Sequence, residues 1–571
     1  MDILVGSRKG LVTYRQDVNP SKGIRCELRC DEKGVQMTAS SKTRATAIGS
    51  SIIAIAVFIA AILQAASPSV VLAYSPSVST TGYPGPGDTI AVSGGGWPAQ
   101  HTLNISYDGT QLATAVVRLQ EGIVGPPIGA FQAPLTIPTA TTTGSHVIQV
   151  TDPDTGLTQQ TTIVVKAEWR QFGFTAAGAR YNPYETTIGT GNVGQLSLAW
   201  SNNTGYTGPV MPAAAEDDLL FVNQAAHYLT NLNATTGKQL WQDYPTDTES
   251  QPVVANGIAY ISDLRFSAYS VATGTLLWQS SYQVFDANPV LANGLIYAAW
   301  QGGNGGVSAY AQAGCGQMTC DPVWTYTTSG AANYYYGTPA VANGHVYLGG
   351  NQLTVLDAKT GALQWTAAIA SGETIQAPIV DKGMVFVAAD STYNGGTFYA
   401  FNAAGCGQAT CTPLWTVHNA SGWGNSPAAA NDVVYIGGKD KMLYAFAEAG
   451  CGAATCAPLW EGVAPGQVLT PPAIANGVIY VSSWYPGDAL AFNATGCGSA
   501  SCAPMWTYDL HANYVDAPPT IANGMLYISD DSGMLYAFHL PNTSLACQGA
   551  SIGAIPRTAC TSHPLHAARM P

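Results

Sequence analysis

Cysteine has the most regular spacing of any residue type in this chain of 571 residues. Eight of the twelve cysteines form four pairs, and each pair follows the pattern Gly-Cys-Gly, three residues, Cys. The pairs are Cys315 and Cys320, Cys406 and Cys411, Cys451 and Cys456, and Cys497 and Cys502. A zinc site would need a second ligand pair beside each turn, and the sequence has none nearby. We therefore predict four disulfide bonds, which is typical of an exported protein.

Carboxylates are the other residues that could do chemistry, and they are scattered. Asp286, Glu373 and Asp516 each stand alone near the start of a repeated unit. Oxygen ligands suit Ca²⁺, but isolated acidic residues are more typical of loop caps and turns. No His-Glu-x-x-His, Gly-x-Ser-x-Gly or phosphate-loop motif occurs. We therefore predict no catalytic residue and no metal ligand, and favour a non-catalytic role while leaving enzymatic activity open.

Five aromatic residues fall in segments where loops are expected. They are Trp300, Tyr335, Trp423, Trp484 and Tyr485. Exposed rings beside small polar groups suit stacking on sugars or gripping a peptide. We predict that these residues form a ligand-binding face, with Trp423 and Trp484 as the first contacts. The alternative, that several of these rings pack inside the fold as core, stays open.

The composition excludes one class of partner. The chain has 21 Lys and Arg against 34 Asp and Glu, a net charge of −13, and no basic stripe that could follow a phosphate backbone. We exclude nucleic acid and expect an unknown carbohydrate, peptide or protein ligand. The 62 glycines and 10% aromatic residues suit many short strands joined by tight turns.

The first 73 residues differ from everything that follows. Residues 47–63 are an uncharged apolar run behind two basic residues, and residues 71–73 offer a small-x-small cleavage site. We predict that residues 37–73 are a signal peptide or, alternatively, an uncleaved membrane anchor, and that the protein is secreted or displayed at the cell surface. Contact with a membrane is expected only through this segment. Residues 1–36 are interpreted as an over-extended gene start.

Residues 74–166 alternate short strands with turn residues, which predicts a small β-sandwich. The stretch Gly87–Pro98 (GDTIAVSGGGWP) and the later GSHVIQVTD resemble Ig-like modules of bacterial surface proteins. This resemblance implies a spacer or an adhesive unit.

The remainder of the chain repeats a four-strand unit. Each copy opens with a proline, and five copies continue into Ala-Asn-Gly, a strong hairpin signal because both turn residues need positive φ. The opening prolines are Pro212, Pro252, Pro289, Pro339, Pro378, Pro427, Pro472 and Pro519. Four strands in 37–50 residues is the size of one propeller blade.

A tryptophan is expected to end each of the first seven copies. These residues are Trp241, Trp278, Trp324, Trp365, Trp415, Trp460 and Trp506. The eighth copy lacks its own, and Trp200 precedes the first copy, so we predict that the strand of Trp200 completes the last blade. The fold class is thus all-β: an eight-bladed β-propeller over residues 167–540, preceded by the small Ig-like β-sandwich and followed by a flexible tail, 541–571.

The repeats resemble those of pyrroloquinoline-quinone (PQQ) type propellers. Asn343–Trp365 (NGHVYLGGNQLTVLDAKTGALQW) closely follows the family consensus, and Trp169–Asn192 resembles the segment that opens such propellers. The same repeat occurs in quinoprotein dehydrogenases, outer-membrane assembly lipoproteins and non-enzymatic surface proteins. In the dehydrogenases the resemblance implies PQQ beneath a Cys-Cys disulfide ring, with Ca²⁺ held by Glu, Asn and Asp; this chain has no Cys-Cys. We predict no cofactor, and keep a PQQ- and calcium-dependent periplasmic dehydrogenase as the alternative.

Overall fold

The computed structural model describes two compact units. The first includes four antiparallel strands, β1 (Asp2–Ser7), β2 (Gly10–Asn19), β3 (Gly23–Cys30) and β4 (Thr38–Ser40). The second is described over residues 74–541 except 83–84, 121–126, 205–209, 217, 225–227, 244–249, 263–264, 284–286, 301–304, 328–336, 392–394 and 513. The apolar run 47–63 of the predicted signal segment 37–73, and the tail beyond 541, lie outside the described residues. Within the described part, no helix is long and apolar enough to cross a membrane.

Two four-stranded sheets follow, and they share one core. One contains β5 (Ser79–Thr81), β6 (Thr89–Pro98), β10 (Ile128–Thr136) and β9 (Arg118–Leu119); the other contains β12 (Thr158–Val165), β11 (Gly144–Thr151), β7 (Thr102–Tyr107) and β8 (Thr110–Val116). Side chains along β10 alternate between buried and exposed, as expected for a strand with one face on a core. Trp97, Ile105 and Val150 are fully buried in that core. The strands predicted for residues 74–166 are confirmed.

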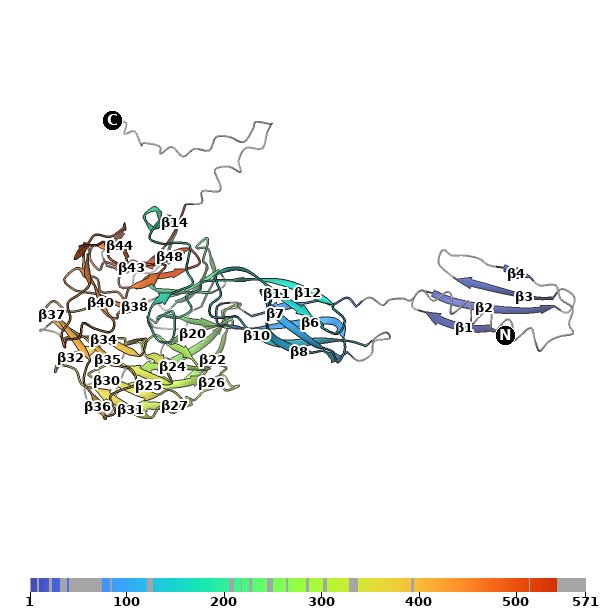
Figure 1. Cartoon of the computed structure of the whole chain (residues 1–571), viewed down its shortest axis with the longest axis horizontal. Helices are drawn as coiled ribbons and strands as arrows, with labels where there is room; N and C mark the ends of the chain where they lie inside the picture. The colour runs from blue at the N-terminus through green and yellow to red at the C-terminus, as the bar shows by residue number, and fades with distance from the viewer. Residues whose placement is uncertain are drawn as a thin grey trace, which may run out of the picture. The chain divides into compact units, whose positions relative to one another are not determined.

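The rest of the second unit consists of eight antiparallel sheets, named I to VIII in chain order (Figure 1). Sheets I to IV are β15 (Val210–Glu216), β16 (Leu219–Gln224), β17 (Tyr228–Asn233), β18 (Gln239–Asp243); β19 (Val253–Ala255), β20 (Ile258–Ser262), β21 (Arg265–Ser270), β22 (Leu276–Gln283); β23 (Val290–Ala292), β24 (Leu295–Trp300), β25 (Gly306–Ala311), β27 (Trp324–Thr327); and β28 (Ala340–Ala342), β29 (His345–Leu348), β30 (Leu353–Asp357), β31 (Leu363–Ala367).

Sheets V to VIII are given in the same way, from the first strand of each sheet to its last. They are β32 (Glu373–Ile375) with β33 (Ile379–Asp381), β34 (Met384–Ser391), β35 (Gly396–Asn402), β37 (Trp415–Asn419); β38 (Ala428–Ala430), β39 (Val433–Gly437), β40 (Met442–Ala447), β41 (Trp460–Val463); β42 (Ala473–Ala475), β43 (Val478–Ser482), β44 (Gly487–Asn493), β46 (Trp506–Ala512); and β47 (Thr520–Ala522), β48 (Met525–Ser529), β49 (Met534–His539), β14 (Ser197–Asn203). The strand of Trp200 therefore lies in sheet VIII, where Trp200 pairs with Ala537, as predicted.

The Asn-Gly pairs turn the chain between the first two strands of their sheets. In all five pairs both residues have positive φ, for example 51° at Asn343 and 78° at Gly344. This is the conformation that a two-residue hairpin of the predicted type requires. In these five sheets the first strand is only three residues long. It pairs with the second strand along one edge, which leaves its other edge free of the sheet's own antiparallel strands.

The repeated tryptophans hold each sheet to the next one. Seven of the eight rings lie against the glycine of a turn in the following sheet, and an added Cβ at Gly361 would lie only 2.4 Å from Cε3 of Trp324. The eighth, Trp506, instead donates its indole N–H to the carbonyl of Leu196. The seven pairs are Trp200 with Gly237, Trp241 with Gly274, Trp278 with Gly314, Trp324 with Gly361, Trp365 with Gly405, Trp415 with Gly450, and Trp460 with Gly496. Each glycine also has positive φ. Because glycine has no side chain, the indole ring can lie directly on the backbone of a turn in the neighbouring sheet.

The position of the tryptophan within its strand corrects our prediction. We expected it to end the fourth strand, but Trp415 begins β37 and Trp460 begins β41. The strand continues past the ring because its remaining residues still pair with the third strand, as Val417 does with Phe398. The tryptophan thus lies at the start of the outer strand or within it, as Trp241 and Trp365 do.

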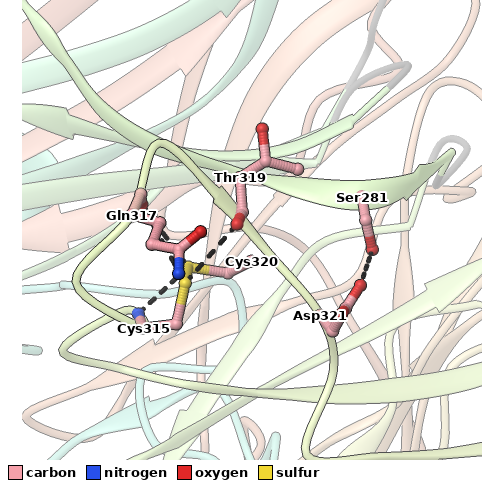
Figure 2. Close-up of a disulfide and its surroundings, with 6 residues drawn as sticks. All are labelled: Ser281, Cys315, Gln317, Thr319, Cys320 and Asp321. Atoms are coloured by element: carbon pink, nitrogen blue, oxygen red, sulfur yellow. Dashed lines mark hydrogen bonds between the residues drawn. A yellow bond between two sulfur atoms is a disulfide. The ribbon is translucent and has the colours of Figure 1, made fainter.

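All four predicted disulfide bonds are present. Figure 2 shows Cys315 bonded to Cys320 within the turn of sheet III, with Asp321 accepting a hydrogen bond from Ser281 of β22 at 2.6 Å. The end of this turn, β26 (Thr319–Cys320), pairs in parallel with β22 of sheet II. Two other turns do the same through β36 (Thr410–Cys411) and β45 (Ser501–Cys502). Three of the disulfide-bonded turns therefore add a fifth strand to the preceding sheet. The disulfide bonds also indicate an oxidising compartment.

Substitution of Gly361 tests the contact between ring and turn. Gly361→Ala should lower the melting temperature more than Gly344→Ala does, because Gly344 has a similar φ but nothing within 4 Å of an added Cβ. Overpacking costs about 1–3 kcal/mol beyond the backbone strain that both variants share. Thermal unfolding followed by circular dichroism measures the difference, and equal losses would contradict the proposed contact.

Candidate functional site

The first strands of the sheets surround an axis. Consecutive first strands from β23 to β47 contact one another, and β15 contacts both β19 and β47. Their free edges face inward, and such edges carry unpaired N–H and C=O groups that need partners. In quinoproteins the cofactor is expected near this axis, so its contents decide whether the chain offers such a site.

A segment of this chain, residues 170–182, fills the axis and is called the axial segment here. It meets the middle residue of seven three-residue first strands in turn. The backbone N–H groups of Val254, Val341, Val380, Ala429 and Ile474 donate to the carbonyl oxygens of Arg170, Ala176, Ala177, Ala179 and Arg180 at 2.7–2.9 Å. The N–H of Leu291 donates to Oε1 of Gln171 at 3.1 Å, and Nδ2 of Asn182 donates to the carbonyl of Ile521 at 3.0 Å. In each of sheets II to VIII, one backbone group of the first strand thereby gains a hydrogen-bond partner in the axial segment.

Arg180 anchors this segment in the interior. Its side chain is fully buried, and its guanidinium donates to the carbonyl oxygens of Phe172, Pro472 and Pro519. It also lies over the rings of Trp169 and Phe172, 5.2 and 4.8 Å from their centroids, which stabilises a cation. Burial lowers the pKa of Arg180 to about 9. The guanidinium therefore stays charged at neutral pH and joins the axial segment to sheets VII and VIII.

A small cavity lies beside the axial segment among the described residues. It has a volume of about 10 Å³ and is lined by residues such as Phe172, Thr338, Pro378 and Ser426. A cavity of this size holds one water molecule at most. PQQ is a fused tricyclic molecule and does not fit in it.

The two described acidic residues that were weighed against a calcium site, Glu373 and Asp516, have different partners. Glu373 accepts hydrogen bonds from Thr397 and Tyr399 at 2.7 and 2.6 Å, Asp516 lies beside Asp531, and Asp286 is outside the described residues. Among the described residues, three metal-ligating side chains come together only at His101, Asp152 and Asp154. That group lies in a turn of the two-sheet region, where Asp152 also accepts a hydrogen bond from Thr155.

The structure corrects the prediction for Trp423. Its side chain is only 2% exposed and packs against Phe398 and Tyr444, and its indole N–H donates to the carbonyl of Gly396 at 3.1 Å. Flanking glycines were expected to leave the ring uncovered, but instead they let the loop fold it into the core. Trp300 is half-buried against the aromatic core of its neighbours. Tyr335 lies outside the described residues.

Trp484 and Tyr485 remain candidates for a binding surface, and Tyr514 joins them. The ring centroid of Tyr514 lies 4.9 Å from that of Trp484 and 5.9 Å from that of Tyr485. Tyr485 is 58% exposed and Tyr514 is 42% exposed. The first two residues lie in the β43–β44 loop and Tyr514 in the connection from β46 to β47, so two loops build one aromatic surface. Sequence analysis missed Tyr514 because no repeat position marks it.

Two carboxyl groups lie next to this aromatic surface. The backbone N–H of Asp531, in the β48–β49 loop, donates to the carbonyl of Tyr514 at 3.3 Å. Burial and the hydrogen-bonded carboxyl of Asp516 raise the pKa of Asp531 to about 7. The neighbouring Asp530 accepts from the Tyr536 hydroxyl at 3.1 Å. The carboxyl of Asp531 therefore holds a proton below about pH 7 and is charged above it.

A comparison with protein families identifies the repeats. The model of the family described as outer membrane protein assembly factor BamB matches residues 192–314, 303–409 and 405–498, which together are more than half of the chain. The chain belongs to this family. The resemblance to PQQ-type repeats is therefore confirmed, and these BamB-like repeats coincide with most of the eight sheets.

Individual relatives of this BamB-like chain are more distant. Quinoprotein glucose dehydrogenase A of Acinetobacter calcoaceticus is 30% identical over 110 residues, which are 17% of this chain and 14% of that protein. The quinohemoprotein alcohol dehydrogenase of Comamonas testosteroni has a TM-score of 0.52 at 14% identity, covering 70% of this chain and 83% of its own. A europium-containing methanol dehydrogenase has a TM-score of 0.51 at 13% identity, covering 66% and 98%. These structural similarities establish the propeller-like fold alone.

The names of these relatives overturn one expectation. We predicted no cofactor, but the curated relative and the structural neighbours are, by name, quinoproteins or metal-containing dehydrogenases. They favour PQQ and a metal ion, so the prediction of no cofactor was wrong. The absence of a Cys-Cys pair was weak evidence against a cofactor. The similarity to quinoproteins lies in the repeats and does not depend on that pair.

Replacing Arg180 tests the role of the axial segment. Arg180→Met leaves three buried carbonyl groups without a donor, and each unsatisfied group costs about 1–3 kcal/mol. The melting temperature should fall by several degrees, and backbone amides at Val341 and Ala429 should exchange hydrogen faster. Arg118→Met, at an exposed position, is the matched control. An equal, small effect of both substitutions would contradict the anchoring role.

The Asp516–Asp531 pair predicts a dependence of stability on pH. The carboxyl of Asp531 has its pKa raised in the folded state, so the native state gains stability as pH falls from 8 to 5, while the unfolded carboxyl stays ionised. Asp531→Asn removes this gain and the repulsion between the two charges. Its melting temperature should exceed that of the parent protein at pH 8, by about 2 °C for each kcal/mol relieved, and should match it near pH 5. A constant difference across this range would refute the coupling.

Proposed function

We propose that this chain is an extracytoplasmic binding protein whose propeller presents an aromatic loop surface to a carbohydrate, peptide or protein ligand. The observation that carries the proposal is the cluster of half-buried Trp484 with exposed Tyr485 and Tyr514. Loops on a rigid scaffold are where binding residues are usually placed. The filled axis supports this position, because it leaves the loop face as the accessible surface of sheets VII and VIII.

Membership of the BamB-like family supports a role in binding. The description of that family, an outer membrane protein assembly factor, concerns assembly and not catalysis. The four disulfide bonds support a location outside the cytoplasm, as a secreted or cell-surface protein.

We propose further that the eight sheets close into one eight-bladed ring. The carbonyl of Ala234 in sheet I accepts hydrogen bonds from Trp200 and Tyr527 of sheet VIII at 3.1 and 3.2 Å. The same pair of donors, Trp324 and Tyr297 of sheet III, serves Ala358 of sheet IV. The contact between the last and first sheets is thus of the same kind as between neighbours. For residues 74–166 we propose an Ig-like module that acts as a spacer.

A second function is favoured by the named relatives: a PQQ- and metal-dependent dehydrogenase. Its test is incubation of the purified protein with PQQ and Ca²⁺, followed by gel filtration and an absorbance spectrum. Stoichiometric retention of the quinone, with dye reduction by alcohols or sugars, would establish this function.

Removal of the exposed rings tests the proposed binding function. The double variant Trp484→Ala/Tyr485→Ala should lose at least tenfold in affinity for any ligand found on glycan and peptide arrays, because stacked rings supply most of the contact area at such sites. Leu459→Ala, which shortens a side chain that is 56% exposed in a disulfide turn, is the control and should bind as the parent does. Unchanged binding by the double variant would refute the proposed surface.

A further inference from the structure

We propose that the aromatic surface of Trp484, Tyr485 and Tyr514 binds a small organic cation with an alkylated ammonium group. This inference rests on the proposed binding function and names the class of ligand for the same surface. It depends on two independent features: the geometry of the rings and the distribution of charge around them.

The rings provide the faces that such a cation needs. Tyr514 stands between the other two, with its plane inclined by 36° to Trp484 and by 38° to Tyr485. The three rings therefore lie close together without being parallel, and two of them are exposed. Alkylated ammonium groups bind to aromatic faces because the negative quadrupole attracts the cation and the methyl groups gain apolar contact.

The charge of this part of the chain is entirely one-sided. Residues 442–541, which form the end of sheet VI and most of sheets VII and VIII, contain no lysine or arginine. Their acidic residues are Glu448, Glu461, Asp488, Asp509, Asp516, Asp530 and Asp531. Lys441 lies directly before this stretch and is exposed, and Lys439 is paired with Asp390 in the neighbouring sheet. A negative field of this kind raises the local concentration of cations and repels anions.

Three loops bring both features to one place. Trp484 and Tyr485 come from the β43–β44 loop, Tyr514 and Asp516 from the β46–β47 connection, and Asp531 from the β48–β49 loop. The hydrogen bond from the Asp531 N–H to the Tyr514 carbonyl joins the backbone of the loop that carries Asp531 to the backbone of the loop that carries Tyr514 and Asp516. A neutral sugar would gain only from the rings, whereas an ammonium group gains from the rings and from the carboxylates.

Calorimetric titration with choline and with its neutral isostere 3,3-dimethylbutan-1-ol provides the test, carried out at low salt because screening weakens exposed charges. Choline should bind about tenfold more tightly than the isostere, and this preference should shrink at high salt. Tyr514→Leu should weaken choline binding at least fivefold. Asp516→Asn should weaken it about threefold, while Asp154→Asn, at an exposed aspartate of the two-sheet region, should leave it unchanged.

The outcomes separate this inference from the proposed function. Equal affinity for choline and its isostere, or full binding by Tyr514→Leu with an unchanged melting temperature, would overturn the cation site. If an array ligand still loses affinity in Trp484→Ala/Tyr485→Ala, the binding function stands without it. If neither the cation nor any array ligand depends on these rings, both proposals fail.

Discussion

The contact between a tryptophan ring and a bare turn in the next sheet is the interaction on which this structure depends. A buried indole removes a large apolar area from water, and here it does so between two sheets that share no hydrogen-bonded ladder in most copies. The turn must carry glycine because both its positive φ and the ring surface exclude a side chain. Repetition of this contact stacks the sheets face to face. The disulfide turns add to it where β26, β36 and β45 extend the outer edge of the preceding sheet.

Stacking the sheets around an axis creates a second requirement, because every first strand turns an unpaired edge inward. The axial segment meets this requirement with its own carbonyl groups, and Arg180 holds it in place. The centre of the fold is therefore occupied by the chain itself. Recognition is left to the loops, where Tyr485 and Tyr514 are exposed beside half-buried Trp484. The centre of the fold is thus occupied by the axial segment, whereas the aromatic rings and carboxylates of the candidate binding surface lie in the loops.

Local features were predictable from the sequence, and features built by distant residues were not. The Asn-Gly turns, the cysteine pairs and the strand of Trp200 follow from spacing and conformational preference alone. The axial segment could not be predicted, since Arg180 finds its partners about 290 and 340 residues away. The burial of Trp423 likewise depends on Phe398 and Tyr444 from neighbouring strands. Glycines on either side of a ring indicate that the loop can bend, but they do not determine whether the ring is buried in the core or exposed to solvent.

The order of hydrogen bonds along the axial segment has a consequence for how such a protein can change over evolutionary time. Each of seven sheets is matched to its own residue between positions 170 and 182, in the order in which the sheets occur in the chain. Duplication or loss of one repeat would shift every later sheet relative to its partner in the segment. A gene encoding this protein therefore cannot gain or lose a repeat alone; the thirteen-residue stretch ahead of the repeats would have to be rewritten at the same time.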